Sequence, residues 1–357
     1  MNTNKYRTDI ITEIDDDLIK QWNNLWEEAE NSTVFNSYQW FEACLNTYNI
    51  GSYELYVCYY DKRLVMVLPL CSLRYAGIKV LGTICNNFLV DTPFLAEKYD
   101  TKLIKYFFGE IMKNNNLFIQ KIDDKASCLI HKLFPDTFFS LISVNPCVHI
   151  SGDPVSLMSK SALSKIRSVI KKNDFLFKLK VYDIKSDLNQ CLKMMFEIEQ
   201  KSSKKIHSKD IFSEEINRVF FSKLSESCRG FIRTYVLYYN NQPIAYQFGF
   251  LYRKTYAAYQ IAYLNEYRKI FPGKIVLFKL IDSLTHEPID MLDFGGGISS
   301  FKQEFTPNYR LLYNMFYSKN MLIMLWWKFV NFARRVNQIL FPIKHTRDHD
   351  FLFKTLS

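Results

Sequence analysis

The sequence predicts a mixed α/β protein of two domains, and three observations lead to this prediction. The chain has 357 residues, more than one domain of ordinary size contains. Because 48% of the residues are hydrophobic, each half can bury a core of its own. Helix-like and strand-like segments alternate, and both halves share one order: helices, a hairpin, a helix, then a strand. We expect domains at 1–150 and 151–320, followed by an amphipathic helix and tail at 321–357.

The first half begins with two helical segments and a hairpin. Asp15 or Asp16 can cap a helix whose apolar residues share one face, and Ser37 can cap a second helix that runs to about Tyr48. Two apolar and aromatic runs flank a short polar turn and predict the hairpin. The ranges expected in this half are strands at 53–60, 64–73 and 117–122 and helices at 102–113 and 125–133.

The second half repeats this order after the linker 151–154, whose sequence Ser-Gly-Asp-Pro favours a turn. A helix at 157–172 carries five basic residues. A hairpin at 231–252 turns at Asn240 and Asn241, whose side chains suit a tight turn. The other ranges expected in this half are strands at 177–181 and 255–263, helices at 188–200, 213–227 and 275–284, and a short strand that ends at Asp293.

The charge of the chain is concentrated in its second half. Residues 1–150 contain 14 Lys and Arg against 18 Asp and Glu, a net charge of −4, so the total of +10 leaves +14 for the remainder. A basic domain favours an anionic partner such as a phosphorylated cofactor, RNA or an anionic membrane. Charge alone does not choose among these partners.

Cysteine usage and the N-terminus predict a cytoplasmic protein without a metal site. The eight cysteines are scattered without a Cys-x-x-Cys pair, which is typical of reduced thiols packed as small apolar groups. His345 and His349 have no further metal ligand near them in the sequence. Residues 1–17 contain no hydrophobic segment of a signal peptide, and the apolar run at 321–327 is too short to cross a membrane.

A basic loop before the helix at 275–284 is the first candidate site. A strand that leads into a helix start presents free backbone N–H groups and the positive end of a helix dipole, which together favour an anion. Basic side chains beside such N–H groups make charge-assisted contacts to phosphate oxygens. The proline can equally mark an ordinary helix start. The cofactor-binding candidates are Arg268, Lys269, Pro272, Gly273 and Lys274.

The second candidate site is the glycine-rich segment that follows Asp293. Three glycines, Gly295 to Gly297, permit a turn that brings Asp293 at a strand end toward Lys302. An acid and an amine at the rim of a sheet suit catalysis, so we take Asp293 and Lys302 as the catalytic candidates. An ion pair between them that stabilises the turn is the alternative.

Five further residues are candidates for substrate binding. Glu199 and Lys204 stand near the end of the helix at 188–200, where a solvated helix end is the alternative. Gln247 is a polar residue in an apolar strand, and Tyr256 and Tyr259 lie in the next strand. Tyrosines in strands often fill a core, which is the alternative for these two.

Several short motifs, taken in order, resemble the CelD-like acetyltransferase branch of the GNAT superfamily, which is related to the FemAB-type peptidyltransferases. The resemblance covers residues 20–317. Its motifs are Phe35-x-Ser-x-x-Trp40, Lys165-Ile-Arg-Ser-Val-Ile-Lys-Lys172, Ile244-Ala-Tyr-Gln-Phe-Gly-Phe250, Ala262-Tyr-x-x-x-Tyr267 with Pro272-Gly273, and Asp293-Phe-Gly-x-Gly-x-x-x-Phe-Lys302.

The resemblance implies two tandem GNAT-like domains with the donor site in the second. It implies that strand 255–263 parts from its neighbour to admit the pantetheine arm of CoA, and that loop 268–274 binds the pyrophosphate. Two positions depart from the family pattern: Phe301 replaces a tyrosine before Lys302, and Ser203-Lys204 lacks the usual aromatic residue.

We therefore expect an N-acyltransferase that moves an acyl group, most simply acetyl, from acyl-CoA to a small-molecule amine. The resemblance points to an amino sugar or a similar precursor of a surface polysaccharide or envelope glycan as the acceptor. Aminoacyl transfer from a charged tRNA is a second hypothesis, and otherwise no nucleic acid is expected.

A third hypothesis is a non-catalytic protein bound to the inner membrane face through residues 321–335. This segment contains Trp326, Trp327, Phe329 and Phe332, followed by Arg334 and Arg335. A terminal helix docked on the protein core is the alternative for the same segment.

Overall fold

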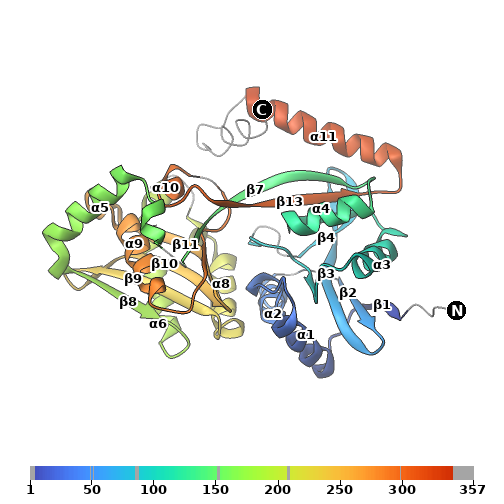
Figure 1. The fold of residues 1–357 in the computed structure, drawn as a ribbon, viewed down its shortest axis with the longest axis horizontal. Coiled ribbons are helices and arrows are strands. Elements are labelled where there is room, and N and C mark those ends of the chain that lie inside the picture. The colour runs from blue at the N-terminus through green and yellow to red at the C-terminus, as the bar shows by residue number, and fades with distance from the viewer. Residues whose placement is uncertain are drawn as a thin grey trace. The chain divides into compact units, whose positions relative to one another are not determined.

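The computed structural model describes residues 5–48, 50, 52–84, 88–150, 153–206, 210–297 and 299–340 (Figure 1). The chain divides into two compact units with breaks after Val144 and Tyr309. Residues 145–309 form unit 2, and the segments on either side of them form unit 1. Each unit contains a mixed sheet with helices packed on it, so the expected mixed α/β class is confirmed.

Both units build their sheets in the same way. In unit 1, β1 (Tyr6–Ile11), β2 (Tyr53–Tyr60), β3 (Arg63–Tyr75) and β4 (Ile78–Thr83) are antiparallel, and β6 (Leu117–Asp123) then runs parallel to β4. In unit 2, β8 (Phe177–Tyr182), β9 (Ile232–Tyr239), β10 (Gln242–Tyr252) and β11 (Thr255–Tyr263) are antiparallel, and β12 (Met291–Asp293) runs parallel to β11. The duplication expected from the order of elements is therefore present in the strand topology.

The expected end of the second domain at residue 320 needs correction, because the sixth strand of each sheet comes from a distant part of the chain. In unit 1, β13 (Tyr309–Tyr317) is antiparallel to β6, and in unit 2 the end of β7 (Phe138–His149) is antiparallel to β12. Residues 310–320, which we assigned to the second domain, thus belong to unit 1 because β13 completes its sheet. Pairing between segments far apart in the chain leaves no local signal in the sequence.

The described part of unit 1 contains five α-helices. They are α1 (Asp16–Glu28), α2 (Tyr38–Leu45), α3 (Thr101–Met112), α4 (Asp124–Leu133) and the C-terminal α11 (Met321–Leu340). Asp15 and Ser37 cap α1 and α2 as expected, since each side chain accepts a backbone N–H of the first turn. A short strand, β5 (Leu95–Ala96), pairs with β3. The expected tail at 341–357, with His345 and His349, lies outside the described residues.

The helices of unit 2 are α5 (Lys160–Asn173), α6 (Leu188–Gln200), α7 (Ser203–Ile206), α8 (Glu215–Ser227), α9 (Pro272–Thr285) and α10 (Ser300–Gln303). The sheet lies between two layers of them. Tyr246 contacts Glu199 of α6, and Phe248 contacts Phe221 of α8, so these helices share one face. Helix α9 packs against β9, β10 and β11 and covers the other face.

Candidate functional site

Strands β11 and β12 part soon after they meet. Their parallel ladder joins Thr255 to Met291 and ends at the pair Ala257 and Asp293, where β12 itself ends. Strand β11 continues for six further residues, 258–263, beyond that last pair. Because every strand residue carries one N–H and one C=O group, this stretch offers a row of backbone hydrogen-bonding groups to an extended ligand. Asp293 stands at the vertex of the opening.

A β-bulge shapes β11 at the same place. Phe248 of β10 pairs with Gln260 and Gly249 pairs with Ala258, which leaves Tyr259 as the extra residue. The Tyr259 ring packs on Phe248 and on Phe221 of α8, so its side chain faces the layer of α6 and α8. Bulges re-aim side chains near active sites, and this one turns Tyr259 and Gln260 toward the same face.

Two of the expected substrate-binding residues instead support the bulge. The side-chain amide of buried Gln247 donates to the carbonyl oxygens of Phe248 (2.9 Å) and Gln260 (3.3 Å), which the irregular ladder exposes. Tyr256 is fully buried, and its hydroxyl lies 3.0 Å from the carbonyl oxygen of Arg233. Both polar groups are used inside the sheet. They hold the strand in place rather than line its open edge.

Glu199 and Lys204 form a polar cluster with two residues that the sequence did not single out. The fully buried Glu199 carboxylate accepts hydrogen bonds from the Tyr246 hydroxyl (2.7 Å) and the Gln260 amide (3.0 Å). Its Oε1 atom lies 3.2 Å from Nζ of Lys204, whose side chain is 30% exposed. The cluster therefore fixes the Gln260 and Lys204 side chains next to the bulge.

Burial shifts the titration of this cluster. Desolvation raises the pKa of Glu199, and the charge of Lys204 only partly offsets that rise. Desolvation likewise lowers the pKa of Lys204, against the influence of Glu199. The pKa of Tyr246 is well above its usual value, so this hydroxyl remains a donor to Glu199. Perturbed groups beside an opening in a sheet are typical of functional sites, although ion pairs with a purely structural role share this property.

Helix α9 begins beside the far end of β11. Arg268 and Lys269 lie in a short 3-10 helix, Asn265–Ile270, and both are exposed. Phe271 then adopts a left-handed conformation with φ 53°, a strain of about 1–3 kcal/mol that is concentrated at ligand-binding segments. Pro272 and Gly273 follow as buried residues of the first turn. The expected helix start is confirmed, and it lies three residues earlier than predicted.

The equivalent helices of the two units differ at their N-termini. Helix α3, which links β4 to β6 in unit 1, is capped by Asp100, whose carboxylate accepts the N–H groups of Lys102 (2.9 Å) and Leu103 (3.0 Å). Helix α9 has no side-chain cap among the described residues. An acidic cap occupies the N–H groups that an anion would bind, and its negative charge repels the anion. Of these two helix starts, only that of α9 therefore suits a phosphate.

The glycine-rich turn holds Asp293 and Lys302 together. The Asp293 carboxylate accepts the N–H of Gly295 at 2.7 Å, and Asp293 is 5% exposed. Nζ of Lys302 donates to the carbonyl oxygens of Gly295 (3.1 Å) and Gly296 (2.8 Å). Lys302 therefore stabilises the turn through its carbonyl oxygens.

Further contacts bring this turn, α10 and the start of α9 into one place. Lys274 of α9 forms an ion pair with Glu304 at 2.5 Å, so this expected phosphate ligand already has a carboxylate partner. A Cβ atom at Gly273 would lie 3.2 Å from the Tyr263 ring and 3.9 Å from Phe301. The donor and catalytic candidates, which are separate in the sequence, thus lie along the same stretch of β11, with the glycine-rich turn beside Ala258 and the start of α9 beside Tyr263.

The sequence did not single out Tyr246, Gln260, Tyr263 or Glu304 as members of this site, although Tyr246 and Tyr263 lie in two of the family motifs. Each is an ordinary strand or loop residue, and its role depends on a contact with a distant segment. Within the described residues, no group of His, Cys, Asp and Glu side chains could hold a metal ion. Nor is any helix among them long and apolar enough to cross a membrane.

Residues 160–303 match the family model of the acetyltransferase (GNAT) domain. The matched segment runs from α5 to α10 and includes the opening between β11 and β12, the bulge and the start of α9. Unit 2 therefore contains an acyltransferase domain of the GNAT type, and the resemblance suggested by the motifs is confirmed for this segment. No curated protein sequence matches the chain.

Solved structures share the fold over most of the chain. The structure of FemX is 11% identical, with 88% of this chain and 98% of that chain covered and a TM-score of 0.60. L-PGS from Bacillus licheniformis is 12% identical (73% and 84% covered, TM-score 0.51). The C-terminal domain of a putative lysylphosphatidylglycerol synthetase from Agrobacterium fabrum is 9% identical (86% and 93% covered, TM-score 0.54). At such low identities the similarity establishes the fold alone.

Proposed function

We propose that the protein is an N-acyltransferase that moves an acyl group, most simply acetyl, from acyl-CoA to a small-molecule amine in the cytoplasm. The parting of β11 from β12 at Ala257 and Asp293 carries this proposal. The pantetheine arm of CoA is an extended chain with two amide groups, so it can pair with the backbone of residues 258–263 as an added strand would. The match of this segment to an acetyltransferase domain supports the same donor.

The start of α9 is the proposed site of the CoA pyrophosphate. The dipole of the helix and the N–H groups of its first turn favour an anion there, and the exposed Arg268 and Lys269 add two positive charges beside it. Lys274 would contribute only if it left Glu304. Unit 1 is not proposed to bind a donor at its equivalent helix because Asp100 caps α3.

The proposed chemistry needs a neutral amine, a held thioester and a route for one proton. The amine nitrogen attacks the thioester carbon, a C–N bond forms, and the C–S bond breaks to release the CoA thiolate. Asp293, at the vertex of the opening, orients the amine and accepts its proton, which then passes to the thiolate. Lys302 fixes the turn that carries Asp293 and stabilises negative charge near it.

The cluster of Glu199, Gln260 and Lys204 is the proposed acceptor side of the site. Lys204 and Gln260 are the members that reach solvent, and they offer hydrogen-bond donors suited to hydroxyl groups and to a negatively charged substituent. Such donors fit an amino sugar or a related precursor of a surface polysaccharide or envelope glycan. The buried Glu199 acts here as a positioning residue for both side chains.

A thiol-release assay with acetyl-CoA and a panel of amino sugars tests this assignment. We expect Asp293→Asn to lower kcat/KM by about 10²–10⁴-fold, the usual contribution of a general base. Asp290→Asn is the matched control, since Asp290 is exposed and lies just before β12. Full turnover by Asp293→Asn would overturn the assignment of the base, and no acetyl-CoA binding by the wild type would overturn the donor.

Aminoacyl transfer from a charged tRNA is the second candidate function, and the basic helix α5 favours it. All five of its basic residues are exposed: Lys160, Lys165, Arg167, Lys171 and Lys172. The fold shared with FemX is compatible with it. Two double variants distinguish acyl-CoA from tRNA as the donor: R268A/K269A removes two positive charges beside the start of α9, and K171A/K172A removes two from α5.

If acyl-CoA is the donor, R268A/K269A raises KM for acyl-CoA about ten-fold, which corresponds to the loss of one charge-assisted contact. The control K171A/K172A then leaves KM unchanged. If tRNA is the donor, activity requires charged tRNA, falls steeply with salt, and is lost in K171A/K172A instead.

A further inference from the structure

Helix α11 docks on unit 1 through the face that carries Trp327, and Trp326 adds one hydrogen bond to the carbonyl oxygen of Ala76 (3.2 Å). Trp327 is 2% exposed and stacks on Phe316, with ring centroids 3.9 Å apart and an interplanar angle of 5°. Its ring also contacts Phe118 of β6 at 5.0 Å, and Met324 joins the same apolar cluster. Trp327, expected to be a membrane-facing residue under the third hypothesis, is therefore a core residue. The alternative of a docked terminal helix is correct for this face.

The opposite face of α11 is apolar and exposed. At about 100° per residue, six large side chains fall within an arc of about 140° that is centred away from Trp327. Their exposed fractions lie between 49% and 75%. We call them the outer stripe: Met321, Leu322, Leu325, Trp326, Phe329 and Phe332. A continuous stripe of this size on a soluble protein marks an interaction surface.

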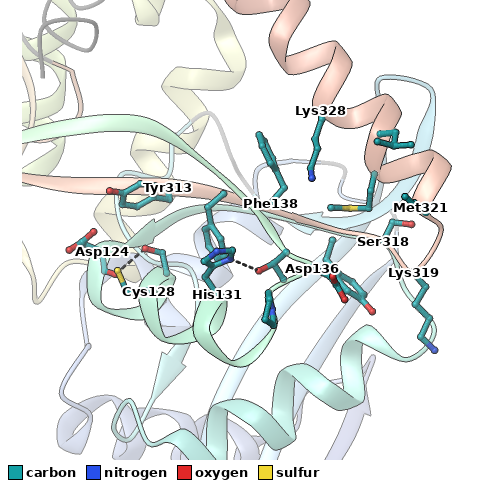
Figure 2. A pocket seen from close by; sticks show the side chains of 17 residues that line it. Asp124, Cys128, His131, Asp136, Phe138, Tyr313, Ser318, Lys319, Met321 and Lys328 are labelled. Carbon is teal, nitrogen blue, oxygen red and sulfur yellow. Dashed lines mark hydrogen bonds between the residues drawn. The ribbon is translucent and has the colours of Figure 1, made fainter. Parts of the chain in front are cut away.

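A cavity in unit 1 continues the outer stripe. It has a volume of about 830 Å³ and lies between α4, β13 and α11 (Figure 2). Met321 and Leu325 belong to the stripe and also line the cavity, with Lys319 and Lys328 beside them. The apolar surface therefore extends from the helix to the edge of a hollow that carries the exposed cations Lys319 and Lys328 on the side of α11 and the exposed carboxylates Asp124 and Asp136 on the other side.

The segment of the chain that carries the stripe is basic. From Phe305 to Arg347 the sequence contains no Asp or Glu and seven Lys and Arg residues. Aromatic and aliphatic side chains on one face of a helix, with Lys and Arg at its borders, are the pattern of a helix that lies in the membrane interface. Basic residues near a membrane surface gain further attraction from anionic lipids.

We propose that α11 seats unit 1 on an anionic lipid bilayer through the outer stripe. The apolar side chains of the outer stripe enter the boundary between headgroups and acyl chains. Lys319 and Lys328 contact lipid phosphates. Charge complementarity favours this occupant over a second copy of the chain, since two copies would oppose basic surfaces.

Vesicle flotation of the full-length protein tests the proposal. We expect the wild type to float with vesicles that mix phosphatidylglycerol with phosphatidylcholine and to stay behind with phosphatidylcholine alone. L325E/F329E should lower the bound fraction by at least about ten-fold, because two apolar anchors are replaced by charges that the membrane repels. Phe175→Glu is the matched control, since Phe175 is 87% exposed and lies in unit 2.

A second variant pair tests the electrostatic part. Each of Lys319→Ala and Lys328→Ala should lower the partition coefficient on anionic vesicles about five-fold without changing the melting temperature. Equal flotation of the wild type and L325E/F329E overturns the proposal. Flotation that requires removal of residues 341–357 also overturns the proposal, because the stripe would then not be available in the full-length protein. A third refuting result is that L325E/F329E converts a dimer into a monomer without affecting flotation.

Discussion

Gly249→Ala is the substitution that most directly tests how the opening in the sheet is built. Gly249 lies in β10 beside the bulge, and a Cβ atom at this position would stand 2.5 Å from the carbonyl oxygen of Ala257 and 2.6 Å from the Tyr256 hydroxyl. Ordinary contact begins at 3.4 Å, so the neighbours must retreat by 3.4 − 2.5 = 0.9 Å. The oxygen of Ala257 belongs to the backbone and cannot turn away.

The displacement falls on the residue that pairs with Asp293. Overpacking of this kind costs about 1–3 kcal/mol, and a backbone clash favours the upper half of that range. Unit 2 spans residues 145–309, which is 165 residues, so a loss of about 2–3 kcal/mol corresponds to a fall in Tm of about 4–12 °C. A shift near 1 Å at the vertex of the opening should also lower kcat/KM about 100-fold.

Thermal unfolding and thiol release measure both effects, with Gly230→Ala as the matched control. A Cβ atom at Gly230 meets nothing within 4 Å, so this variant should melt within about 2 °C of the wild type and keep its activity. If Gly249→Ala behaves like Gly230→Ala, then the close packing of β10 against β11 does not position the site. Loss of stability with full activity would separate the fold from the proposed chemistry.

Three further outcomes are expected. Trp327→Ala should destabilise unit 1 by about 3–5 kcal/mol in urea unfolding, whereas half-exposed Trp326→Ala should cost far less, and equal losses would contradict the docked face of α11. Burial raises the pKa of Glu199, so the stability that this group contributes is present at low pH and is lost as the pH rises through the folded-state pKa. In urea unfolding from acid to neutral pH, Glu199→Gln should remove this pH dependence. The control Glu197→Gln, at an exposed position, should keep it. Gly295→Ala, at φ 69° and 3.0 Å from a backbone oxygen, should cost about 1–2 kcal/mol and reduce thiol release; unchanged values would show that the turn tolerates a side chain.

The local elements were predictable because their signals are local. The helix at 188–200 and the hairpin at 231–252 lie where periodicity and turn residues placed them. The strands β1, β4, β5, β7 and β13 were missed, and two of them, β13 and the end of β7, complete sheets whose other strands are distant in the sequence. The candidate site shows the same division: the start of α9 and the turn after Asp293 were expected, but their positions along the same stretch of β11 were not.

By itself, the sequence determined the mixed α/β class, the repeated order of elements, the basic second half and the identity of the groups able to bind a phosphate. Tertiary structure alone decided which of these groups meet. Gln247 is a polar residue in an apolar strand and was expected to bind substrate, yet its amide stabilises the bulge. Tyr246 and Gln260 were not singled out, yet both donate hydrogen bonds to Glu199. The reason is physical: a side chain's role depends on which unsatisfied groups and charges lie beside it, and in a sheet those neighbours come from other strands.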